Sequence, residues 1–129
     1  MIMHIAVTET TDDTFDMPLG TIATMGMMKA NNNSEYEKAE SAVFKPVHQK
    51  SVDQGLKGSW SLGKILSPTG SDAYASHTTI NMYKDLDQYL SEVNTDLSTF
   101  ISDWQPVTKG LETRDMKYVY MATLERKLR

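Results

Sequence analysis

The stretch that decides the fold is residues 41–55, SAVFKPVHQKSVDQG, which continues an amphipathic pattern from residue 34. Apolar and small residues recur there at three- and four-residue spacing, as on one face of a helix: Tyr36, Ala39, Val43 and Val47. Ser34 followed by Glu37 has the spacing of a capping box, so the helix is expected to begin there. Pro46 removes a backbone hydrogen bond in its interior and predicts a kink near residue 42 or a bend around a sheet.

Strands are predicted on both sides of this helix, because side chains alternate with the two-residue period of a pleated strand. The alternating segments are residues 19–30, 59–66, 74–84 and 114–128. Asp85 followed by Gln88 predicts a capped helix to about residue 93, and a second helical piece over 95–104 is expected to be closed by Pro106. The order strand, helix, strand, strand, helix, strand predicts an α+β, ferredoxin-like split βαβ fold with a four-stranded antiparallel sheet.

The length of 129 residues fits one domain, which we place at residues 17–129, with residues 1–16 as an N-terminal arm. That arm has no basic n-region and no long apolar run, so it is not an intact secretory signal. A cytoplasmic location is the default expectation, although a periplasmic or secreted protein that has lost its signal would look the same.

Charge and composition exclude several classes of function. The formal net charge of −4 disfavours a nucleic-acid partner, and no apolar run approaches the roughly 20 residues that span a bilayer. The chain has no cysteine, so disulfides, thiolate zinc sites and cysteine nucleophiles are ruled out. The serine-nucleophile motif G-x-S-x-G and phosphate-cradling glycine loops are also absent, which argues against hydrolases and nucleotide-binding proteins.

A family resemblance follows from the element order and from three short motifs, FKPVHQ at 44–49, GSWSL at 58–62 and SPTGSDA at 67–73. Over about residues 18–126 the chain resembles the dimeric α+β barrel superfamily, including its short bacterial members without an assigned activity. The resemblance implies a homodimer that pairs two open sheet faces. Known members include cofactor-independent monooxygenases and haem enzymes, but residues 85–105 contain no histidine for a haem, so no cofactor is expected.

Candidate site residues follow from the strand faces and from the end of the bent helix. His48 lies at the margin of the apolar face and is the candidate catalytic base; the alternative is a boundary histidine that makes one structural hydrogen bond. A ligand-binding cavity between sheet and helices, suited to a small apolar or aromatic molecule, is expected to be lined by Trp60, Lys64, His77, Asn81, Tyr83 and Tyr118.

Each of these assignments has a competing interpretation. Two histidines distant in sequence, His48 and His77, are weak evidence for a metal, so no metal site is predicted. Trp60, Tyr118 and the methionines would also suit a dimer interface, where such residues are enriched. The two functional hypotheses are therefore a small-molecule-binding protein or cofactor-independent monooxygenase-like enzyme, and a non-catalytic dimeric interaction module.

Overall fold

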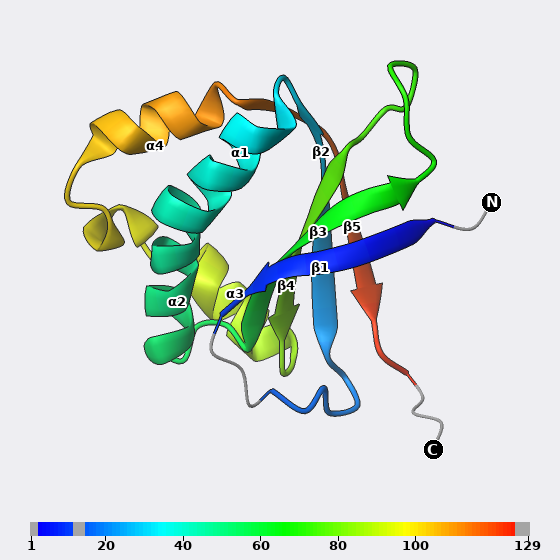
Figure 1. Cartoon of the computed structure of the whole chain (residues 1–129). Coiled ribbons are helices and arrows are strands. Elements are labelled where there is room, and N and C mark those ends of the chain that lie inside the picture. The colour runs from blue at the N-terminus through cyan, green and yellow to red at the C-terminus, as the bar shows by residue number, and fades with distance from the viewer. Residues whose placement is uncertain (1–2, 12–14, 126–129) are drawn as a thin grey trace.

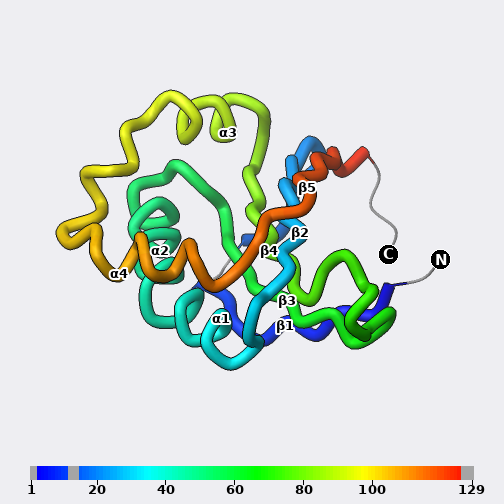
Figure 2. Tube along the Cα trace, turned by 90° about the horizontal axis from the view of Figure 1, so that it is seen from above, coloured from blue at the N-terminus to red at the C-terminus, as the bar shows by residue number. Residues whose placement is uncertain are grey.

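The computed structural model describes residues 3–11 and 15–125, which form one antiparallel sheet with helices on one of its faces. Figures 1 and 2 show the helices gathered on one side and the strands on the other. The strands are β1 (His4–Thr10), β2 (Ile22–Ala30), β3 (Ser59–Ser67), β4 (His77–Tyr83) and β5 (Arg114–Thr123). They are ordered β1-β3-β4-β2-β5 across the sheet. The α+β prediction is therefore confirmed.

The number of strands differs from the prediction of four. The fifth strand, β1, comes from the segment that we expected to be an arm, and it pairs with β3 at the edge of the sheet. Its register shifts twice, between His4 and Ile5 and between Val7 and Glu9. These irregularities, and the exposure of most of its side chains, leave little periodic signal in the sequence.

The long bent helix is present as three consecutive segments, α1 (Asn33–Ala39), a π-helical turn (Glu40–Phe44) and α2 (Lys45–Asp53). In the π turn the Lys45 amide donates to the Glu40 carbonyl. The wider turn directly precedes Pro46, which has no amide hydrogen to continue an α-helical ladder, so the predicted disturbance near residue 42 is a π turn. The cap is Asn32, whose side chain accepts from the Glu35 amide, in place of the predicted Ser34.

The second helical region begins as predicted. The Asp85 side chain accepts from the Gln88 amide at 2.8 Å and starts α3 (Leu86–Val93). A 3₁₀ turn (Leu97–Phe100) and α4 (Trp104–Leu111) follow. Pro106 was expected to end a helix but lies in the first turn of α4, where its missing amide hydrogen costs nothing. None of the described helices is long and apolar enough to cross a membrane.

The apolar side of α3 faces solvent, whereas the amphipathic pattern predicted that this side would be buried. Three apolar side chains at helical spacing, Leu86, Leu90 and Val93, are 54%, 43% and 59% exposed, whereas Glu92 is buried. We call these three side chains the α3 stripe. Glu92 and the Tyr89 ring, which meets the Tyr83 ring edge to face at 5.2 Å, therefore attach this helix to the rest of the fold, and the α3 stripe faces outward.

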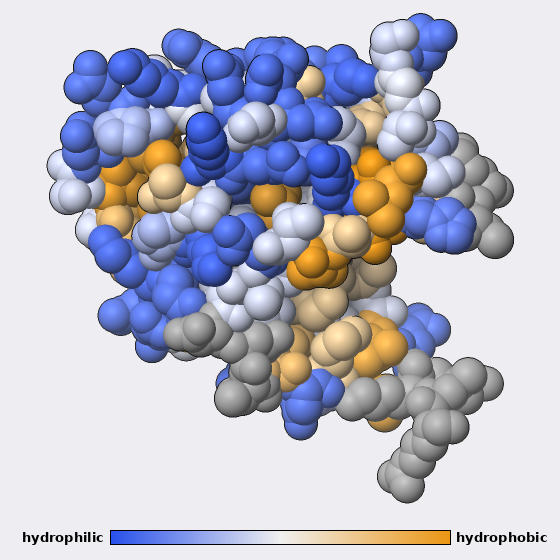
Figure 3. Space-filling model, in the orientation of Figure 1, coloured by the Kyte–Doolittle hydropathy of each residue, from blue (hydrophilic) through white to orange (hydrophobic). Residues whose placement is uncertain are grey.

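One buried cluster lies between the helices and the sheet, around Met28, Tyr36, Trp60 and Leu62. A second, of Met27, Ile65 and Ala75, lies on the opposite face of the sheet. At one edge of the sheet, β5 is exposed along nearly its whole length, including Met116, Tyr118, Val119, Tyr120 and Met121. Figure 3 shows further apolar surface over the strands on the side away from the helices. Large exposed apolar patches are commonly covered by a partner in other proteins.

Candidate functional site

Five of the six predicted ligand-binding residues share the helix-covered face of the sheet. Trp60 pairs with Asn81 across β3 and β4, and Lys64 pairs with His77. Tyr83 follows Asn81 at the two-residue period and points to the same face. Tyr118 is different, because it pairs with Met27, which neighbours Thr78 on the opposite face. The structure thus brings the first five together and leaves Tyr118 on the open face.

His48 also belongs to this face. Its ring stacks on the fully buried Trp60, with the ring centroids 4.8 Å apart and the planes 10° from parallel. Its Nδ1 lies 2.9 Å from Nζ of Lys57, a residue in the connection between α2 and β3. An ammonium group donates, so Nδ1 accepts and the imidazole hydrogen sits on Nε2.

Lys57 is the centre of a buried polar cluster. Its side chain is 2% exposed and its Nζ also donates to Oδ1 of Asn81 at 2.6 Å. The third partner is Oε2 of Glu92, at 3.3 Å. Asn81 in turn donates through Nδ2 to the Thr24 hydroxyl at 3.2 Å. All three donors of the ammonium group therefore have partners, which is the condition for burying a charge.

Glu92 closes the cluster from the side of α3. The Tyr83 hydroxyl donates to its Oε1 at 2.6 Å, and the Ser51 hydroxyl contacts its Oε2. Together with Lys57, these contacts join α2, α3 and β4 through one carboxylate. We call His48, Ser51, Lys57, Asn81, Tyr83 and Glu92 the Lys57 cluster.

Burial shifts the protonation equilibria in this cluster. Burial, reinforced by the Lys57 charge, holds the pKa of His48 well below its usual 6.5, so His48 is neutral at pH 7. Burial also lowers the pKa of Lys57, although the Glu92 carboxylate opposes the shift. The pKa of the Tyr83 hydroxyl is raised by burial and by its bond to Glu92.

A groove of about 430 Å³ runs along the outside of the Lys57 cluster. Lys57 forms part of its wall, between the chain around Phe15 and Pro18 on one side and α2 on the other. Lys84 and Gln88 line the same groove. A molecule in this groove would therefore lie against a residue that contacts both His48 and Asn81.

A second buried polar group lies beside α1 and the π turn. The Tyr36 ring meets the His77 ring edge to face at 4.8 Å, and both residues have no exposed surface. Burial raises the pKa of Glu40 to about 7, against the attraction of Arg114 and the neighbouring Tyr36 hydroxyl. Trp60 Nε1 and the Tyr36 hydroxyl have no hydrogen-bond partner among the described residues.

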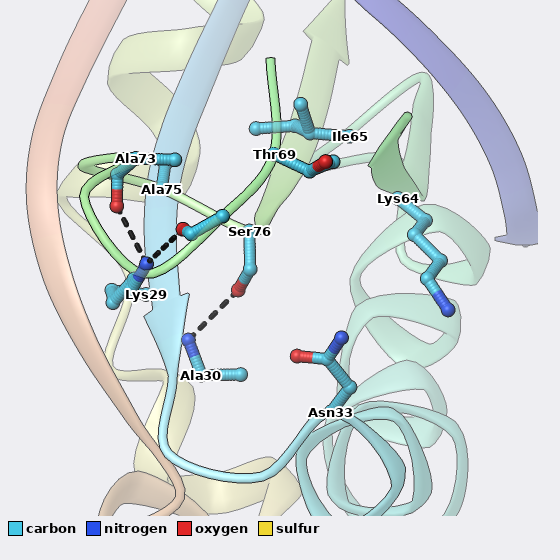
Figure 4. A pocket seen from close by; sticks show the side chains of 10 residues that line it. Lys29, Ala30, Asn33, Lys64, Ile65, Thr69, Ala73, Ala75 and Ser76 are labelled. Atoms are coloured by element: carbon cyan, nitrogen blue, oxygen red, sulfur yellow. Dashed lines mark hydrogen bonds between the residues drawn. The ribbon is translucent and has the colours of Figure 1, made fainter. Parts of the chain in front are cut away.

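Two further hollows involve the remaining predicted residues. Lys64 lines an enclosed hollow of about 260 Å³ between β3, the start of α1 and the loop before β4, with Asn33, Thr69 and Ser76. Figure 4 shows these side chains arriving from separate segments. Tyr118 lines a more open hollow of about 320 Å³ with Lys29 and Tyr74. Trp60, His77, Asn81 and Tyr83 line none of these hollows or the Lys57 groove.

Sequence reasoning missed Lys57 and Glu92, the two charged residues of the cluster. Lys57 lies in a turn next to Gly58, where a lysine is normally solvated. Glu92 lies on an amphipathic helix whose apolar side suggested the opposite orientation. Neither position carries a local signal of burial, because each is buried by contact with the other.

Comparison with known proteins supports the fold. No protein-family model matches the sequence, and no curated protein matches it. A solved structure from Fusobacterium nucleatum subsp. nucleatum, described as "Putative monooxygenase", superposes with a TM-score of 0.51 at 15% sequence identity. The match covers 95% of this chain and 49% of that one, so the chain spans about half the length of its structural neighbour. At this identity the likeness shows a shared fold.

Proposed function

We propose that the protein binds a small apolar or aromatic molecule, in the manner of a monooxygenase-like protein, at the groove beside Lys57. The observation that carries the proposal is the convergence of His48, Asn81 and Tyr83 on one buried lysine that also lines an open groove, with Trp60 stacked on His48. A volume of about 430 Å³ falls within the range of about 300–1,000 Å³ typical of small-molecule sites. The monooxygenase-like fold of the structural neighbour supports the same assignment.

The chemistry of the groove favours a phenol or a related aromatic molecule with one acidic oxygen. Lys84 is an exposed cation that attracts such an oxygen, and the buried ammonium group of Lys57 adds positive charge from behind the wall. Phe15, Pro18 and Val52 provide an apolar wall. A cofactor-independent monooxygenase-like reaction, with molecular oxygen as the oxidant, is the catalytic extension of this proposal. His48 Nδ1 already accepts from Lys57, so His48 would act on the ligand by holding the ammonium group in place.

The test uses 1-naphthol as the probe and NMR of the histidine imidazoles as the readout. We expect titration to shift the His48 signals more than those of His77, which lies on the far side of Trp60 in the sheet. Lys57→Met should weaken binding at least tenfold, and Lys84→Met, in the same groove but outside the cluster, should weaken it less. Binding that leaves His48 unshifted, or no binding at millimolar probe, would contradict the proposal.

A second candidate, a dimeric interaction module, is favoured by a separate observation. The chain exposes apolar side chains on both faces of β5, with Tyr118 60% exposed on the open face and Val119 58% exposed on the other. A homodimer through the open sheet face, as in the dimeric α+β barrel arrangement, would bury Tyr118 and its neighbours. The predicted role of Tyr118 is then at the interface.

Light scattering tests this second candidate directly. We expect a dimer at micromolar concentration, and Tyr118→Glu should shift the population to monomer because it places a charge in an apolar contact. Lys109→Glu, on α4 away from this face, is the matched control and should leave the dimer intact. A wild-type chain that is monomeric at these concentrations would contradict the proposed homodimer.

A further inference from the structure

Ser76, the residue before β4, has an unusual set of neighbours in the wall of the enclosed hollow. Its Oγ lies 2.9 Å from Nδ1 of His77, and Nε2 of the same imidazole lies 3.4 Å from Oε1 of Glu37. A hydroxyl, an imidazole and a carboxylate are therefore neighbours, although Nε2 of His77 makes no hydrogen bond within the described residues. Ser76 is half-buried and lines the hollow of about 260 Å³ directly.

We propose that Ser76 is a nucleophilic serine, activated by His77 and oriented by Glu37, that accepts an acyl group from small activated carboxylic esters entering this hollow. The arrangement meets the first geometric requirement for an activated nucleophile, a base within hydrogen-bond reach, and places a carboxylate beside that base. This site is separate from the Lys57 groove and does not depend on the function proposed there.

The proton path follows from the contacts. Oε1 of Glu37 lies 3.4 Å from Nε2 of His77, a contact that is not a formed hydrogen bond. The carboxylate charge favours the tautomer with the hydrogen on Nε2, which leaves Nδ1 as the acceptor facing the Ser76 hydroxyl. Burial lowers the pKa of His77, against the attraction of Glu37, so the imidazole is neutral at pH 7 and able to take a proton. As Ser76 Oγ bonds to the ester carbonyl carbon, its proton passes to Nδ1. The alcohol then leaves with that proton as its bond to carbon breaks.

Deacylation reverses these steps with water in place of the alcohol, so that ester and water give acid and alcohol. The Ala30 amide donates to Ser76 Oγ at 2.9 Å and fixes the position of that oxygen. The Met28 carbonyl, at 3.3 Å from Oγ, is a competing acceptor for the hydroxyl hydrogen, but His77 Nδ1 is nearer.

The hollow restricts the substrate to a short acyl group. Its volume of about 260 Å³ is below the roughly 300–1,000 Å³ of sites for drug-sized ligands. Lys64 and Asn33 line the hollow with Ser76, as Figure 4 shows, and both can donate to an acyl oxygen. Lys64 Nζ also lies 3.7 Å from Oε1 of Glu37, so the cation and the relay carboxylate are neighbours.

The absence of cysteine from the sequence allows a direct test of activation at position 76. Ser76→Cys gives a chain with a single thiol, and Ser71→Cys, at an exposed position of the same loop, is the matched control. We expect iodoacetamide to alkylate the thiol at 76 at least tenfold faster than the thiol at 71 at pH 7. Equal rates, or a slower reaction at 76, would overturn the proposal.

Glu37 is tested as a positioning residue in the Ser76→Cys chain. Glu37→Gln should slow alkylation at least threefold, and Glu37→Asp should restore part of the rate because it keeps the carboxylate. An alkylation rate unchanged by Glu37→Gln would show that Glu37 does not position His77.

The unmodified chain provides the independent test, since Ser76 variants lose or alter the bond to the Ala30 amide and could fold poorly. We expect p-nitrophenyl acetate to leave one acetyl group, which peptide mapping places on Ser76. Acetylation confined to lysines, or none at all, would show that Ser76 only completes the hydrogen bonding at the end of the β2–β4 ladder.

Discussion

Glu40 provides the sharpest quantitative test of the buried polar interior. This carboxyl group is 2% exposed, and burial raises its pKa from 4.5 to about 7. The folded chain therefore holds a proton at pH values where the unfolded chain has lost it, so stability that is present below pH 4.5 disappears as the pH rises through about 7. With these two pKa values, linkage gives a loss of about 2.5 kcal/mol between pH 5 and pH 8.

Glu40→Gln removes this titration and keeps the shape of the side chain. Urea unfolding at pH 5 and pH 8 should therefore show the variant gaining about 2.5 kcal/mol relative to the wild type at the higher pH. Subtracting the difference between variant and wild type at pH 5 from the same difference at pH 8 cancels any pH-independent effect of the substitution. A variant whose stability relative to the wild type is the same at both pH values would refute the assignment of a raised pKa to Glu40.

Three other substitutions test the remaining polar and packing features. Lys57→Met leaves the Glu92 carboxylate buried without its cation and should cost about 3 kcal/mol in urea unfolding, while adding Glu92→Gln should cost less than the sum of the two single changes. In the wild type, the lowered pKa of His48 means that below pH 6.5 the unfolded chain binds a proton that the folded chain does not, so the free energy of unfolding falls as the pH falls. His48→Gln should reduce the slope of this fall by up to about 1.4 kcal/mol per pH unit. Gly26→Ala should cost about 1–3 kcal/mol, because its Cβ would lie 2.9 Å from Thr79 Oγ1; an unchanged urea midpoint would show that Thr79 can move aside.

The parts of the fold that sequence reasoning predicted are those with a local physical signal. Alternation marked β2 to β5, and the Asp85–Gln88 spacing marked the start of α3. Pro46 predicted a disturbance of the long helix because a missing amide hydrogen acts on its own turn. In contrast, β1 exists through pairing with a strand about 55 residues away, and its bulges break the two-residue pattern that would have revealed it.

The residues of the candidate site were likewise predicted where a local pattern places them and missed where only tertiary contacts do. His48, Trp60, Asn81 and Tyr83 were predicted because strand and helix periodicity decide which face a side chain occupies. Tyr118 was placed on the wrong side for a shared cavity, because periodicity along β5 does not say which of its two sets faces the helices. Ser76 and Glu37 were missed because their relation to His77 depends on three segments meeting at the end of β4.

The Lys57 cluster and the exposed apolar surface of α3 both follow from the burial of Glu92 against the rest of the fold. An amphipathic helix normally packs through its apolar side, but α3 contacts the fold through the Tyr89 ring and through Glu92. The Tyr83 hydroxyl, the Ser51 hydroxyl and Lys57 hold Glu92 in place. The cost of burying this carboxylate is offset by those three contacts, and the α3 stripe remains in solvent as a result. The same arrangement that creates a polar interior suited to a ligand thus also leaves an apolar surface that a partner could cover, so binding at the Lys57 groove and contact at α3 would be coupled through one side chain.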